Sequence, residues 1–126
     1  MLIRLIALIG FVVSTAFPAF AESTWDAYVV SVEDGNTVTV NTKYGSKEPE
    51  FVLLFYGIEA PTQSQPFGRE AMAFLQGMMP VGTKVGVESV GQLEAGPISA
   101  LVQVGGDSVN YKLVMAGLAW VDRQRS

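Results

Sequence analysis

Residues 25–42 read WDAYVVSVEDGNTVTVNT, and this stretch decides the fold. Residues 25–32 are rich in aromatic and β-branched side chains, which favour a strand. Residues 33–36 then form a turn, because Gly35 and Asn36 tolerate a positive φ. Residues 37–42 alternate between polar and apolar side chains, which is typical of the returning strand of a hairpin. The stretch therefore predicts a tight β-hairpin with Asp34 and Asn36 at its tip.

Three more strands follow the hairpin. Apolar or alternating runs predict them over residues 51–56, 83–88 and 98–104. A polar loop at 44–49 separates the first of these strands from the hairpin. The chain has no internal repeat, no low-complexity tract and no linker, so it is expected to form one domain.

Two helices complete the expected elements. Residues 68–79 place four apolar side chains on one helical face: Ala71, Phe74, Leu75 and Met78. A shorter helix is expected over 110–116, with Asn110 as its N-cap and Gly117 as its stop. The apolar residues 118–121 are expected to pack onto the domain. The order of three strands, a helix, two strands and a helix predicts an α+β fold, mainly β, built on a five-stranded OB barrel.

Residues 1–21 have the pattern of a cleaved signal peptide. Arg4 gives a positive start, residues 5–13 form an apolar run, and Ala19-Phe20-Ala21 resembles a cleavage site. The alternative is a membrane anchor, but the apolar run is shorter than the roughly 20 residues needed to span a bilayer. We therefore expect an exported monomer with a single domain over residues 22–126, periplasmic or extracellular, and no membrane association after cleavage.

The composition excludes several kinds of chemistry. The 126 residues include no histidine and no cysteine, which rules out a zinc finger, a Ser-His-Asp triad, a thiol nucleophile and disulfides. The formal charge is −4, from 12 acidic and 8 basic side chains. An acidic balance argues against nucleic acid as a partner, because a basic surface normally dominates that affinity.

Four motifs together resemble the staphylococcal nuclease (thermonuclease) family. They occur in the family's order and with nearly its spacing: VSVEDGNTV at 30–38, GIEAP at 57–61, QPFGREA at 65–71 and VNYKLVMAGLAWV at 109–121. The resemblance implies a five-stranded OB barrel with helices and a calcium-dependent hydrolysis of DNA and RNA. The family commonly continues into a third helix, so the resemblance implies a two-helix version with that helix missing.

The residues that carry this activity in the family are replaced here. The resemblance places the family's two catalytic arginines at Leu54 and Pro97, and its general base at Thr62. One of its aspartate metal ligands corresponds to Asn36 and another to Glu59. A hydroxyl cannot accept a proton at neutral pH, and a lost transition-state donor costs on the order of 10²–10³ in rate. We therefore expect no family-type catalysis.

Some binding capacity is expected to remain at these positions. Asp34, Asn36 and Glu59 could form a residual, weak calcium site, although no cofactor is required. The alternative is that Asp34 accepts backbone N–H bonds and that Glu59 is solvated. The polar residues 62–65 would form the rim of the site. The candidate binding residues are therefore Asn36, Glu59, Thr62 and Gln63.

Three functions are compatible with the sequence. The first is an exported, non-catalytic nuclease-like module that binds an unknown ligand or protein, or has a structural role. The second is a weak metal-dependent nuclease that uses Glu59 and Asp34, with Lys84 or Arg69 as the electrophile. The third is a periplasmic OB-fold ligand binder. Five aromatic residues could form a stacking groove, but we expect them in the core: Tyr28, Phe55, Tyr56, Tyr111 and Trp120.

Overall fold

A computed structural model describes residues 23–45, 49–92 and 96–122 of the chain. The strands are β1 (Ser23–Asp34), β2 (Thr37–Asn41), β3 (Glu50–Phe55), β4 (Ile58–Glu59), β5 (Lys84–Gln92), β6 (Ile98–Val104), β7 (Asp107–Ser108) and β8 (Trp120–Val121). The helices are α1 (Gly68–Met78) and α2 (Val109–Met115). All five strands and both helices expected from the sequence are present, with ends that differ by a few residues.

Five of these strands close into a barrel. β1 pairs with β2, β2 with β3, and β5 with both β1 and β6, all antiparallel. The barrel closes because β3 also pairs with β6, in parallel, with Leu53 opposite Ile98 and Phe55 opposite Ala100. This mixed, closed arrangement confirms the OB-type barrel with two helices that the sequence predicts.

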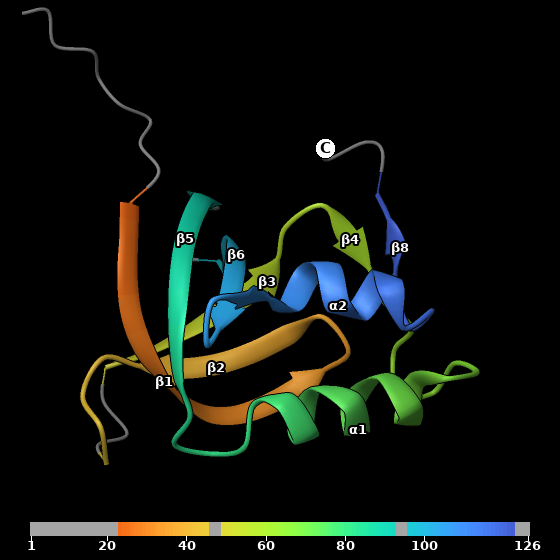
Figure 1. Cartoon of the computed structure of the whole chain (residues 1–126), viewed down its shortest axis with the longest axis horizontal. Coiled ribbons are helices and arrows are strands. Elements are labelled where there is room, and N and C mark those ends of the chain that lie inside the picture. The colour runs from red at the N-terminus through yellow and green to blue at the C-terminus, as the bar shows by residue number, and fades with distance from the viewer. Residues whose placement is uncertain (1–22, 46–48, 93–95, 123–126) are drawn as a thin grey trace, which may run out of the picture.

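β1 is long enough to belong to both halves of the barrel. Residues 23–28 pair with β5, and residues 28–34 pair with β2. The register of β1 with β2 shifts twice, between Val29 and Ser31 and between Val32 and Asp34. Such bulges bend a strand and increase its twist, which lets one strand turn the corner of a small barrel. In Figure 1, β1 curves from β5 toward the β1–β2 turn, which lies between α1 and α2.

The core fills the barrel and extends under both helices. Alternate residues of each strand point inward, because side chains alternate between the faces of a strand. The largest fully buried side chains are Phe55, Leu53, Leu75, Met79, Leu113, Val38, Val40, Val85, Val87, Val102 and Val109. The expected apolar face of α1 is only partly buried, because Ala71 and Leu75 are fully buried while Phe74 and Met78 are half-buried.

The role expected for Asn110 was wrong. The N-cap of α2 is Ser108, whose hydroxyl accepts the N–H of Tyr111 at 3.1 Å. Asn110 is instead 5% exposed, and its amide bonds backbone groups of the barrel. The sequence pattern could not distinguish the two roles, because asparagine suits a helix N-cap and a buried backbone bridge equally well.

The expectation that the aromatic residues belong to the core holds for one of them and fails for two. Phe55 is fully buried, whereas Tyr111 and Trp120 are 61% and 55% exposed. Tyr28 and Tyr56 are half-buried. Residues 118–121 pack onto the domain only in part. Ala119 is buried and Leu118 packs against the core, whereas Trp120 and Val121 of β8, which pairs with β4, are exposed.

The expected signal peptide at residues 1–21 lies outside the described residues. Within the described part of the chain, neither helix has the length and apolar character needed to cross a bilayer.

Candidate functional site

The tip of the β1–β2 hairpin packs against the loop that precedes α1. A Cβ added to Gly35 would lie 3.0 Å from the Cβ atoms of both Ala60 and Ala71, and 3.2 Å from the Pro61 carbonyl oxygen. The Gln63 side chain also reaches the hairpin, where its Nε2 donates to the Glu33 carbonyl at 3.2 Å. The structure therefore brings Asp34, Asn36 and residues 60–63 to one end of the barrel.

Leu54 belongs to the same end through strand pairing. It is opposite Thr37 on β2 and opposite Ser99 on β6, on the outer face of the barrel, and is half-buried. The N–H of its neighbour Phe55 donates to the Asn36 carbonyl at 2.9 Å. Pro97 directly precedes β6, two residues before Ser99. Leu54 thus lies on β3 between β2 and β6, Asn36 lies in the turn before β2, and Pro97 precedes β6.

The oxygens expected to bind a cation have local partners. Asp34 Oδ1 accepts the Gly35 N–H at 2.9 Å, as proposed in the alternative to a metal site. Asn36 Oδ1 accepts the Thr37 hydroxyl at 3.0 Å. Glu59 is half-buried on β4, opposite Trp120. Among the described residues there is no group of three or more His, Cys, Asp or Glu that could hold a metal, so a calcium site formed by two carboxylates and one amide remains a prediction.

The position expected to carry the general base is Thr62, which lies in a loop held by hydrogen bonds among its own residues. Thr62 Oγ1 lies 3.3 Å from Ser64 Oγ, and the Thr62 N–H donates to Gln65 Oε1 at 2.7 Å. The Thr62 carbonyl in turn accepts the Gln65 N–H at 2.9 Å. These bonds give the rim at residues 62–65 a defined shape, with exposed side chains.

Positive charge is scarce around this end. The described residues contain four cationic side chains: Lys43, Arg69, Lys84 and Lys112. Lys84 pairs with Asp26 at 3.6 Å, and Lys112 pairs with Asp107 at 3.2 Å. Lys84 is opposite Tyr28, six residues and roughly 20 Å along β1 from Asp34. Lys84 therefore does not fit the role of electrophile, whereas Arg69, in the first turn of α1, adjoins the site.

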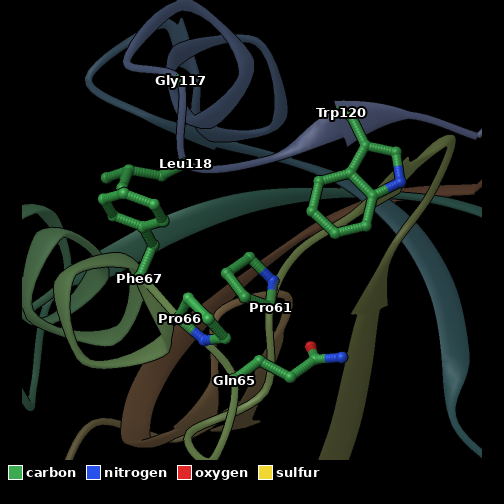
Figure 2. A pocket seen from close by; sticks show the side chains of 7 residues that line it. All are labelled: Pro61, Gln65, Pro66, Phe67, Gly117, Leu118 and Trp120. Carbon is green, nitrogen blue, oxygen red and sulfur yellow. The ribbon is translucent and has the colours of Figure 1, made fainter.

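An apolar groove beside the rim was missed by sequence reasoning. It has a volume of about 240 Å³ and is lined by Pro61, Gln65, Pro66, Phe67, Gly117, Leu118 and Trp120. Figure 2 shows the ring of Phe67 beside Leu118 on one side and the Trp120 indole on the other, with both prolines between them. The sequence feature that could have indicated this groove is Phe67, a large apolar residue in a polar loop between Pro66 and Gly68.

The match to known families agrees with this fold. The family model of the staphylococcal nuclease homologues matches residues 52–126, which is more than half of the chain. The chain belongs to this family. No curated protein matches it. The match begins inside β3, yet the barrel of this staphylococcal nuclease homologue also needs the hairpin of β1 and β2 to close. Membership confirms the resemblance that the four motifs indicate.

Proposed function

We propose that this staphylococcal nuclease homologue is an exported domain that has lost phosphodiesterase activity and acts as a binding or structural module. One observation supports the proposal. The hairpin tip packs against the loop at residues 60–63 and Leu54 is paired with Thr37, but the positions that the resemblance assigns to catalysis hold Leu54, Thr62 and Pro97. The framework of the site is kept while the groups for phosphate chemistry are replaced.

Electrostatics supports the same conclusion. Hydrolysis of a phosphodiester builds negative charge on the phosphoryl oxygens, and cations or a metal must stabilise that charge. At this end the described residues offer Arg69 alone, beside Glu33, Asp34 and Glu59. A polyanionic substrate would therefore meet net repulsion.

The direct test is a cleavage assay on DNA and RNA with calcium, magnesium or a chelator. We expect no metal-dependent cleavage above the chelated control. Robust calcium-dependent cleavage that is abolished by Glu59→Ala would contradict the proposal and establish the weak nuclease as the function. The matched control is Glu88→Ala, which changes the same residue type on β5 and should leave any cleavage unchanged.

A further inference from the structure

We propose that the groove between Phe67 and Trp120 binds a positively charged protein segment that inserts one large apolar side chain. This inference rests on the proposed function, since it names the partner class of the binding module. The groove joins the loop before α1 to the segment after α2, so its two walls come from parts of the chain far apart in the sequence. Its volume of about 240 Å³ suits a single large side chain.

The first argument is the conformation of Phe67. This residue has φ 68° and ψ 4°, and it is the one non-glycine residue with a positive φ in the described part of the chain. Glycine normally takes this left-handed conformation, because a β-carbon clashes with the backbone there, and asparagine offsets the clash with local hydrogen bonds. Phe67 is nevertheless a bulky residue, and it is 66% exposed. Its ring therefore gives the fold little burial in return for the strain, and such strain clusters at binding sites.

The loop holds Phe67 in place. The Gly68 N–H donates to the Gln65 carbonyl at 2.9 Å, and the Ala71 N–H donates to the Phe67 carbonyl at 3.0 Å. A Cβ on Gly68 would lie 1.8 Å from the Thr62 carbonyl oxygen, so the chain passes directly over this oxygen. Because the backbone is fixed on both sides of Phe67, the side chain starts from a defined position before any partner arrives, which lowers the entropic cost of binding.

The second argument is charge complementarity. Glu59 is opposite Trp120 in the β4–β8 pair, and directly opposed residues share a face of a sheet. Glu70 lies in the first turn of α1, three residues after Phe67. Glu59 thus shares a face with Trp120, Glu70 is close in the chain to Phe67, and the hairpin tip with Asp34 adjoins Pro61 and Gln63. The Glu33 carboxylate, by contrast, accepts the hydroxyls of Ser31 and Thr39. This pattern favours a partner that carries lysine or arginine beside its apolar anchor.

The same charges decide against two other occupants. Single-stranded nucleic acid also stacks on exposed aromatic side chains, but it needs cations along its phosphates, and Arg69 alone adjoins this groove among the described residues. A second copy of the chain would bring its own carboxylates to the contact. Gln65 suits a peptide, because its Oε1 accepts the Thr62 N–H and its Nε2 can donate to a partner carbonyl.

The test uses three fluorescein-labelled peptides in a buffer with chelator and no nucleic acid. The first has one tryptophan flanked by lysines, the second replaces the lysines by glutamates, and the third replaces the tryptophan by alanine. We expect fluorescence anisotropy to show binding of the first peptide, at least tenfold weaker binding of the other two, and weaker binding of the first peptide at high salt.

Protein variants then locate the site. Phe67→Gly and Trp120→Ala should each weaken binding of the lysine–tryptophan peptide at least tenfold, whereas Tyr111→Ala should not, because Tyr111 is equally exposed but does not line the groove. Phe67→Gly also separates binding from folding, since glycine accepts φ 68° without a clash and its melting temperature should not fall.

Two results would overturn the inference: equal binding of the lysine and glutamate peptides, or unchanged affinity in Phe67→Gly. Displacement of the peptide by oligothymidylate would also overturn it, in favour of a nucleic-acid surface. The cleavage assay decides the proposed function separately. If the protein cleaves nucleic acid and also binds the peptide, only the proposed loss of catalysis is wrong. If it does neither, only the proposed class of partner is wrong.

Discussion

Asn110 Oδ1 accepts the backbone N–H of Val102 at 3.0 Å and so ties α2 to strand β6. The same amide donates through Nδ2 to the carbonyls of Tyr56 and Ala100, at 3.1 and 3.2 Å. Tyr56 follows directly after β3, and its N–H in turn donates to the Ala100 carbonyl at 2.8 Å. One side chain thus links α2 to β6 and to the end of β3, at the pair of strands that closes the barrel.

Replacement of this amide should therefore be costly. Asn110→Leu removes three hydrogen bonds and leaves the Val102 N–H buried without its partner. We expect a loss of about 3 kcal/mol in the free energy of unfolding, measured by urea denaturation. The neighbouring control Tyr111→Ala removes an exposed ring and should change stability by about 0.5 kcal/mol or less. Wild-type stability in Asn110→Leu would show that the bridge contributes nothing.

Two glycines of α1 should respond oppositely to alanine. At Gly68 a Cβ would lie 1.8 Å from the Thr62 carbonyl oxygen, so Gly68→Ala must displace the loop that carries the rim. At Gly77 a Cβ meets nothing within 4 Å, and alanine favours a helix by about 1 kcal/mol over glycine. Thermal melting should show Gly77→Ala stabilised and Gly68→Ala destabilised by at least about 2 kcal/mol. The same sign for both variants would contradict the packing described here.

Replacement of Asn41 by an apolar residue should increase the stability of the protein. It is 3% exposed, and within the described residues its Oδ1 has no hydrogen-bond partner. A buried acceptor without a donor costs about 1–3 kcal/mol, so Asn41→Leu, of similar volume, should raise the free energy of unfolding by about 1 kcal/mol. The exposed neighbour Thr42→Val is the control. Loss of stability in Asn41→Leu would mean that the amide has a partner in solution, such as a buried water.

Restored carboxylates should create calcium affinity without restoring cleavage. Asn36→Asp with Thr62→Glu adds two negative oxygen ligands near Asp34 and Glu59, and calcium prefers such ligands. Isothermal titration should show at least a tenfold gain in calcium affinity, or about 1.4 kcal/mol. Unchanged affinity would show that these positions do not converge on one site.

The arginine positions form the second half of that experiment. Leu54→Arg with Pro97→Arg, added to the two carboxylates, should raise cleavage but not calcium affinity, because arginine stabilises the transition state and does not ligate the metal. Leu54→Gln with Pro97→Gln in the same background is the uncharged control. Equal cleavage by the arginine and glutamine versions would indicate that Leu54 and Pro97 do not face the scissile phosphate.

The sequence by itself determined the elements and their order. The hairpin at residues 25–42 is local, since β-branched residues, a turn rich in glycine and asparagine, and a period of two act over a few neighbours. The same holds for α1, whose apolar spacing repeats along the helix. The resemblance also predicts that Leu54, Thr62 and Pro97 stand at catalytic positions, because a resemblance compares residues one by one.

Only the tertiary structure decided which of these residues meet. The parallel pairing of β3 with β6 joins segments more than 40 residues apart, and no local pattern encodes it. It determines that Asn110 becomes a buried bridge and leaves the N-cap of α2 to Ser108. It is likewise packing, not propensity, that leaves Phe67 and Trp120 exposed on either side of one groove. Whether a given apolar side chain is buried depends on how all the apolar residues of the chain share the limited volume of the core.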